Sequence, residues 1–143
     1  MKALTLIQPW ATLIAIGAKK IETRSWYTDY RGPLAIHAGK NKEFLYLCGM
    51  DPFNLVGHSA SLPMGAMVAT CELVHVKRIN AMTSFVACKE YWWNKKGWML
   101  DRNERAFGDF TEGRYMWLLT NIKMLPEPIP AKGAQGLWNW EES

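Results

Sequence analysis

The residue types best suited to chemistry gather in residues 17–24, which read Gly-Ala-Lys-Lys-Ile-Glu-Thr-Arg. Gly17 is predicted to end a helix, which places Lys19 in the turn that follows. Glu22 and Arg24 come next, and two residues apart on a strand they project from the same face. One acid and two bases at this spacing can form a charge-assisted network. The alternative interpretation is an exposed ladder of salt bridges that contributes little to stability.

A short helix and a strand are expected to position this segment. Pro9 suits the first turn of a helix, where its missing N–H is not needed, and Leu13 and Ile14 follow at helical spacing. Residues 21–26 are rich in β-branched and aromatic types, which predicts a strand. Residues 30–33, Tyr-Arg-Gly-Pro, have the chemistry of a turn.

A histidine and a further acid lie on strands predicted later in the chain. The run 34–38 predicts a strand that carries His37 on the face opposite Ile36. The run 67–79 predicts a long strand on which Glu72 points inward, on the face that also carries several valines.

The remaining elements complete a mainly β architecture. Strands are predicted over 3–7, 114–125 and 135–140, and short helices over 42–48, with Asn41 as the cap, and from Thr83 or Ser84 to Trp92. Residues 50–65 and 94–112 are predicted to be loops, and the prolines at 126, 128 and 130 an extended linker, too rich in proline for a central strand. We therefore expect one domain over residues 1–143, of the α+β, mainly β class, with about six strands in a small mixed or closed barrel and two or three short helices.

The positive charge is concentrated in the first third of the chain. Residues 1–42 hold seven bases and two acids, a balance of +5, whereas the remainder holds ten bases and eleven acids, a balance of −1. This distribution favours an anionic partner near the first segment. A solvated basic face without a partner is the alternative.

Cysteine usage and hydropathy exclude several classes of protein. The three cysteines are widely spaced and odd in number, which predicts buried thiols rather than a disulfide framework. Cys71 and His75 share a strand face but stand roughly 13 Å apart, too far to share a zinc ion. We expect no metal and no cofactor. No apolar run is long enough to cross a bilayer and no secretory signal is evident, so we expect a cytoplasmic protein without membrane association; the oligomeric state stays open.

Several blocks of sequence resemble the ASCH family, in order and over nearly the whole chain. They are Gln-Pro-Trp-Ala at 8–11, the Gly-x-Lys-x-x-Glu-x-Arg pattern at 17–24, Tyr-Arg-Gly at 30–32, Ile-His-Ala at 36–38, Gly-Asp-Phe at 108–110, Tyr-Met-Trp-Leu-Leu at 115–119, Lys-Gly at 132–133 and Gly-Leu-Trp at 136–138. The resemblance implies a PUA-like β-barrel with a cleft at which Lys19, Glu22 and Arg24 lie.

The function implied first by this resemblance is binding of RNA or a nucleotide. In such a cleft Lys19 and Arg24 would contact phosphate, and Glu22 would accept a hydrogen bond from a base edge. Aromatic residues near the motif are candidates for base stacking. The expected binding residues are Trp10, Arg24, Trp26, Tyr30 and Arg31.

A metal-independent hydrolase is the alternative that the resemblance implies. Some similar proteins hydrolyse the amide of acetylated cytidine with a lysine base, a threonine and a later glutamate, to which Lys19, Glu22 and Glu72 would correspond. Glu22 departs from that pattern, because a carboxylate cannot replace an alcohol nucleophile. Others are assigned ribonuclease activity on single-stranded RNA, for which His37 adds a candidate base. The candidate catalytic residues are thus Lys19, Glu22, Glu72 and His37.

The third alternative is a protein–protein adaptor, because the family also occurs in coactivators. Most of the eight tryptophans are expected to fill the core, Trp117 and Trp138 among them. Trp92, Trp93 and Trp98 form a separate cluster that could line a groove.

Overall fold

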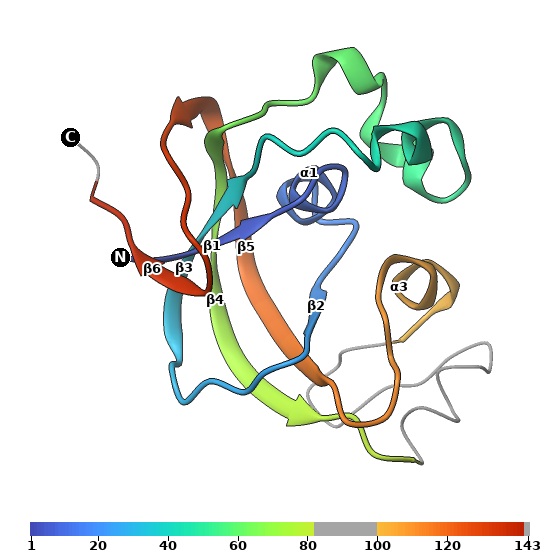
Figure 1. Cartoon of the computed structure of the whole chain (residues 1–143), viewed down its shortest axis with the longest axis vertical. Helices are drawn as coiled ribbons and strands as arrows, with labels where there is room; N and C mark the ends of the chain where they lie inside the picture. The colour runs from blue at the N-terminus through green and yellow to red at the C-terminus, as the bar shows by residue number, and fades with distance from the viewer. Residues whose placement is uncertain (82–99, 142–143) are drawn as a thin grey trace. The chain divides into compact units, whose positions relative to one another are not determined.

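A computed structural model describes residues 1–81 and 100–141 of the chain (Figure 1). The helix predicted to start at Thr83 or Ser84, the cluster of Trp92, Trp93 and Trp98, and Cys88 lie outside the described residues. Within the described ranges, no helix is both long and apolar enough to cross a membrane.

The fold is mainly β, as predicted, with six strands and two α-helices in the described part of the chain. The strands are β1 (Lys2–Leu6), β2 (Ile21–Arg24), β3 (Gly32–Ala38), β4 (Ala66–Arg78), β5 (Tyr115–Pro130) and β6 (Leu137–Asn139). They are hydrogen-bonded in the order β2-β5-β4-β3-β1-β6. The helices are α1 (Trp10–Ala15) and α3 (Arg102–Phe107), and three 3-10 turns are η1 (Leu45–Gly49), η2 (Phe53–Val56) and η3 (Ser59–Ser61).

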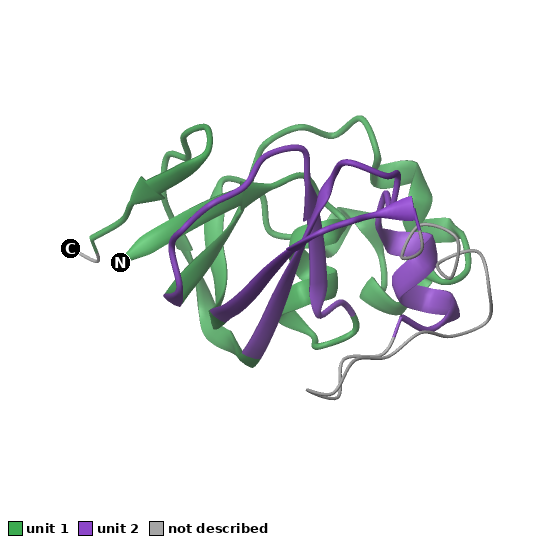
Figure 2. Ribbon diagram, turned by 90° about the horizontal axis from the view of Figure 1, so that it is seen from below, with its two compact units in different colours: residues 1–18, 33–72, 121–143 green, residues 19–32, 73–120 purple. Residues whose placement is uncertain are grey.

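The chain divides into two compact units, which Figure 2 shows in different colours. Unit 1 consists of residues 1–18, 33–72 and 121–143, and unit 2 of residues 19–32 and 73–120. The long strands β4 and β5 each contribute to both units. The candidate catalytic and binding residues are therefore distributed between the two units.

In unit 1, β1 lies between two strands and pairs with both. It pairs in parallel with β3, from Lys2 opposite Leu34 to Leu6 opposite Ala38, and antiparallel with β6. Ala3, Ala35 and Met67 form a buried cluster, against which the half-buried Leu125, Ile129, Ala131, Trp138 and Trp140 pack. Trp138 thus covers this core, whereas Trp117 in unit 2 is completely buried.

Helix α1 ends where the sequence predicts. Gly17 has a φ of +79°, a left-handed conformation that favours glycine. The N–H of Ala18 donates to the carbonyl of Leu13, and the N–H of Gly17 to that of Ile14. These two bonds form a Schellman motif, which satisfies the last carbonyls of the helix and directs the chain into the motif segment.

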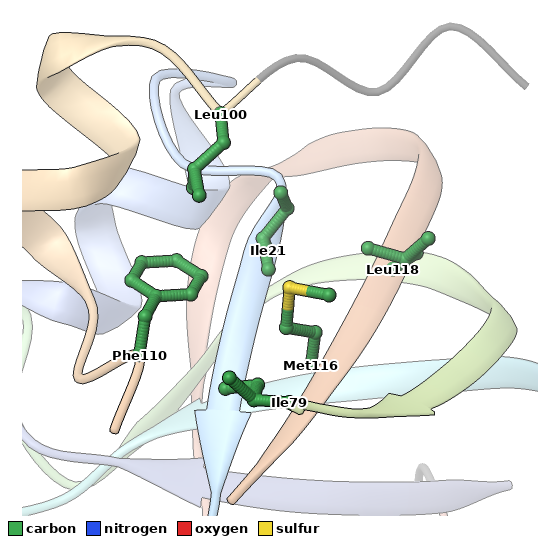
Figure 3. Packing of buried hydrophobic residues seen from close by; sticks show 6 residues of the cluster. All are labelled: Ile21, Ile79, Leu100, Phe110, Met116 and Leu118. Carbon is green, nitrogen blue, oxygen red and sulfur yellow. The ribbon is translucent and has the colours of Figure 1, made fainter. Parts of the chain in front are cut away.

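In unit 2, β2 is held by its register and by one hydrophobic cluster. It pairs antiparallel with β5, from Ile21 opposite Leu118 to Arg24 opposite Tyr115. Figure 3 shows how Ile21 points into the cluster that anchors the strand, which consists of Ile21, Ile79, Leu100, Phe110, Met116 and Leu118. The strand ends at Arg24, so the predicted extension to Trp26 was wrong.

The region predicted as a loop over 94–112 contains helix α3. Asp101 caps this helix, because its Oδ1 accepts a hydrogen bond from the N–H of Glu104 at 2.9 Å. The prediction of a loop was wrong because the polar composition of this helix hid its Asp-x-x-Glu start signal.

The proline-rich segment is the end of β5 rather than a linker. The next residue, Ala131, donates its N–H to the carbonyl of Gly65, immediately before β4. N–H groups alternate between the two edges of a strand, so positions 126, 128 and 130 direct their nitrogens away from β4. The missing donors of the three prolines therefore remove no hydrogen bond to that neighbour.

Two smaller predictions are also corrected. The helix predicted over 42–48 is the 3-10 turn η1, which begins only at Leu45, and Asn41 instead accepts a hydrogen bond from the N–H of Glu43. Residues 50–65, predicted as a loop, contain the turns η2 and η3. The predicted burial of the cysteines is confirmed for Cys48 and Cys71, and burial raises the pKa of the Cys71 thiol to about 12.

Candidate functional site

Lys19 lies completely buried in unit 2, at the exit of the turn after Gly17. Its Nζ donates a hydrogen bond to the carbonyl of Ile21 and stands 3.8 Å from Oε1 of Glu22. The ammonium group that was expected to contact phosphate therefore does not reach solvent, and its partners are Ile21 and Glu22 of β2. A buried ammonium is stable only with such partners.

The predicted network of Lys19, Glu22 and Arg24 is present. Nε and Nη2 of Arg24 each lie 3.1 Å from Oε2 of Glu22, and the N–H of Thr23 donates to Oε1 of the same carboxylate. The Glu22 side chain is 10% exposed and that of Arg24 is 24% exposed. The buried carboxylate thus fixes a guanidinium group that still reaches solvent.

Glu104 in α3 is a residue that the sequence-based prediction missed. It is 5% exposed, and its Oε1 accepts the N–H of Lys20 at 2.5 Å. Its Oε2 has no hydrogen-bond partner in the described part of the chain. Burial raises the pKa of the Glu104 carboxyl, although the Lys19 ammonium and the N–H groups of Lys20 and Ile21 oppose this rise. The Asp-x-x-Glu signal marks the start of a helix but does not indicate that the glutamate reaches β2.

Trp117 stands directly opposite Glu22 on β5. The predicted position of Trp117 in the core is confirmed, since its side chain is completely buried. Its Nε1 donor finds no acceptor within the ranges described. Trp26 packs edge-on against it, with ring centroids 4.8 Å apart and an interplanar angle of 86°. Trp26, itself half-buried, therefore covers a buried tryptophan.

An arginine and two tyrosines lie together after the end of β2. Nη1 of Arg31 donates at 2.8 Å to the carbonyls of both Thr28 and Tyr30. The guanidinium carbon of Arg31 lies 5.8 Å from the ring centroid of Tyr27, which in turn lies 5.7 Å from that of Tyr115. Tyr27 is 50% exposed. Sequence reasoning missed Tyr27, although its place beside Trp26 and near Arg31 in the sequence was visible.

Tyr30 is partly buried, and Thr23 forms hydrogen bonds within unit 2. Tyr30 is half-buried, and this burial raises the pKa of its hydroxyl. The Thr23 hydroxyl accepts the N–H of Asp109, and its carbonyl accepts a bond from Arg114 at 3.4 Å. Thr23 thus connects β2 to the 108–110 turn.

Trp10, Glu72 and His37 belong to unit 1 rather than to the body that holds Lys19. Trp10 packs edge-on against Phe44 and Phe53, with centroids 5.3 and 5.9 Å apart. Glu72 is exposed, so its predicted inward orientation was wrong. The alternate set of β4, which includes the fully buried Met67, Ala69 and Leu73, forms the buried face instead.

His37 is buried within a chain of hydrogen bonds in unit 1. Its Nε2 lies 2.7 Å from the carbonyl of Ala131, which can only accept, so this nitrogen carries a proton. Its Nδ1 lies 3.1 Å from the hydroxyl of Thr5, which also accepts the indole N–H of Trp138. Both ring nitrogens are engaged by protein atoms. This geometry suits a histidine that positions the segment around Ala131.

A pocket of about 870 Å³ opens beside His37 and is formed entirely by residues of unit 1. Three glycines and two lysines, Lys40 and Lys132, are part of its wall. Its volume falls in the range of ligand sites, roughly 300–1,000 Å³. The structure therefore offers two candidate sites, one in each unit.

Comparison with known proteins gives two kinds of similarity. A segment of 39 residues is 51% identical to Activating signal cointegrator 1 of Homo sapiens, and 35 residues are 54% identical to the same protein of Mus musculus. These segments cover 27% and 24% of this chain, and only 7% and 6% of those relatives.

The solved structures show likeness of fold alone. A crystal structure of ASCH from Zymomonas mobilis has a TM-score of 0.50 at 15% identity, covering 90% of this chain and 72% of that one. A point mutant of that protein gives 0.51 at 14% identity, covering 90% and 74%. The family model described as the ASCH domain matches residues 4–125, which include the whole network of β2 and most of β5. The chain therefore belongs to the ASCH family.

Proposed function

We propose that this protein binds single-stranded RNA through the surface of unit 2 that carries Arg24, Tyr27 and Arg31. The observation that carries the proposal is the setting of Arg31. Two carbonyl groups fix its guanidinium, and no carboxylate among the described residues pairs with it. Its orientation is thus set while its full charge stays available for a phosphate.

The neighbouring residues supply the other contacts that a single strand requires. Tyr27 is half exposed beside the Arg31 guanidinium, and base stacking on such a ring tolerates any sequence. Arg24, held by Glu22, adds a second partly exposed cation. In this proposal Glu22 and Lys19 act from below the surface: they position Arg24 rather than contact RNA.

Arg31→Gln is expected to weaken binding of a short single-stranded RNA. It should also lower the slope of log K against log salt concentration by about 0.7, the contribution of one phosphate contact on a single strand. Fluorescence anisotropy over a series of salt concentrations measures both quantities. Lys123→Gln is the matched control, because it removes one exposed charge from β5 outside this surface. Equal slopes for wild type and Arg31→Gln would refute the assignment.

Tyr27→Ala tests the stacking contact separately from charge. It should weaken binding by about 1–3 kcal/mol, the usual contribution of one stacked base, without changing the salt slope. Tyr27→Phe keeps the ring and should bind like the wild type. An equal loss of RNA affinity in Tyr27→Ala and Tyr27→Phe would show that the hydroxyl, rather than stacking of the ring, makes the contact.

A metal-independent hydrolase is the second candidate, and Glu104 is the observation in its favour. The buried Glu104 carboxyl has one oxygen without a partner in the described part of the chain, and the Lys19 ammonium counteracts the rise of its pKa on burial. Hydrolysis of an amide or of RNA needs one group to take a proton from the nucleophile and one to give a proton to the leaving group. In this candidate function Glu104 is the later glutamate of the hydrolase pattern, the role that the sequence analysis assigned to Glu72.

Incubation with acetylated cytidine and with short single-stranded RNA tests this candidate. If it is correct, wild type releases product from one of them and Glu104→Gln does not. Glu112→Gln, which changes an exposed carboxylate, should keep the activity. A wild-type protein that releases no product from either substrate is not a hydrolase of these classes. If RNA binding is also absent, a protein–protein adaptor is the function that remains.

A further inference from the structure

We infer that the pocket of unit 1 is a second ligand site, which binds the terminal phosphate of a nucleotide or of a nucleic-acid end. The inference does not rest on the surface of unit 2, because every residue of the pocket wall belongs to unit 1. Its support comes from the charge of the wall, its free donors and the close packing of its floor.

The two charged residues of the pocket wall are both lysines. Lys40 and Lys132 are exposed at its edge, and no aspartate or glutamate contributes to it. Neither lysine forms an ion pair with a carboxylate of residues 1–81 and 100–141. Two unneutralised charges at one pocket match a phosphomonoester, which carries close to −2 at neutral pH.

Main-chain donors add to these charges. The four consecutive residues 132–135 line the pocket, and their N–H groups have no hydrogen-bond partner in the described part of the chain. Consecutive free N–H groups in an irregular segment favour anions. A tetrahedral phosphate, with several acceptor oxygens, can use more of these donors than a planar carboxylate can.

The floor of the pocket is built for close approach. A Cβ on Gly65, whose φ is +64°, would stand 2.6 Å from Cε of Lys40, so this lysine lies directly over the glycine. A Cβ on Gly133 would stand 2.6 Å from Cε1 of His37 and 2.7 Å from Oγ1 of Thr5. His37 and Thr5 therefore pack directly against Gly133 of the 132–135 segment, and Lys40 packs against Gly65.

Isothermal titration with adenosine 5′-monophosphate, adenosine and inorganic phosphate tests the site. We expect the monophosphate to bind and adenosine not to bind. Lys40→Gln and Lys132→Gln should each lower the affinity for the monophosphate about tenfold, the effect of losing one hydrogen bond to a charged group. Lys123→Gln should leave its affinity unchanged. Equal affinity in the wild type and in both pocket variants would overturn the inference, as would an absence of binding by every phosphorylated probe.

Two oligonucleotides distinguish the source of the phosphate. If a 5′-phosphorylated strand binds more tightly than both its 5′-hydroxyl form and the mononucleotide, the site reads a nucleic-acid end. If the mononucleotide binds as tightly as the phosphorylated strand, the site takes a free nucleotide. The measurements are repeated in the Arg31→Gln protein, which should keep its affinity for the monophosphate even where strand binding is lost. Loss of monophosphate binding in that variant would place the phosphate outside this pocket and end the inference.

Discussion

A single buried carboxyl group links helix α3 to the start of β2. Glu104 accepts the N–H of Lys20 through one oxygen, and the other oxygen has no partner in the described part of the chain. Because burial raises its pKa in the folded protein, the folded state holds this proton more firmly than the unfolded state does. The group therefore makes stability depend on pH.

The sign of this dependence follows from the raised pKa. Below the unfolded value, near 4.5, both states are protonated and Glu104 brings no penalty. As the pH rises through the folded pKa, the buried group must ionise and stability is lost. Glu104→Gln keeps the oxygen that accepts from Lys20 and cannot ionise, so we expect its free energy of unfolding to rise relative to the wild type as pH increases. Urea denaturation between pH 4 and pH 8 measures this difference, with Glu112→Gln as the exposed control. Parallel curves for the wild type and Glu104→Gln would contradict the assignment.

At the same scale, sequence reasoning found the local part of the network and missed the distant part. The contacts among Lys19, Glu22 and Arg24 follow from their spacing, because a turn and one strand face bring them together. The contact of Glu104 with Lys20 joins positions 84 residues apart. A polar helix gives no local indication of which strand its glutamate will meet, so only the tertiary structure can show this contact.

Among the elements, the 108–110 turn packs against β2. It bonds to Thr23 and places Phe110 in the cluster that buries Ile21. A Cβ on Gly108 would stand 2.8 Å from the Phe110 ring and 3.3 Å from Cγ2 of Thr23. There is no room for a larger residue without moving one of these side chains.

Gly108→Ala is therefore expected to lower the free energy of unfolding by about 1–3 kcal/mol, the usual effect of overpacking. Gly49→Ala is the matched control, because nothing lies within 4 Å of the position of its Cβ. Thermal and urea denaturation of both variants measures the difference. If the two variants have the same stability, the turn is not tightly packed on β2.

Sequence patterns predicted elements well where apolar periodicity was strong. The helix stop at Gly17 and the strands over 34–38 and 67–79 follow from composition and spacing, and the structure confirms them within a residue or two. Two elements were not predicted because their composition is unusual for their conformation. Helix α3 is polar, and strand β5 continues through three prolines. In both, hydrogen bonds to distant residues decide the conformation.

For the whole molecule, the charge excess of the first third is divided between the two units. Lys19, Lys20, Arg24 and Arg31 belong to unit 2, and Lys2, Lys40 and Lys42 to unit 1. The sequence indicated one basic region with a single anionic partner. The fold separates this region, because the chain leaves unit 1 after Ala18 and returns at Pro33. The basic residues of one stretch of sequence are therefore divided between two units, which no linear charge count can reveal.

The prolines of β5 have a consequence for how copies of this protein behave in concentrated solution. An exposed strand edge normally invites a neighbouring molecule to add its own strand, which is a common route to aggregation. Along 126–130 the edge directed away from β4 has no N–H donor, because the three positions whose nitrogens face that edge are all prolines. A foreign strand would find acceptors there without the matching donors, so this edge resists intermolecular pairing while the opposite edge completes its own sheet.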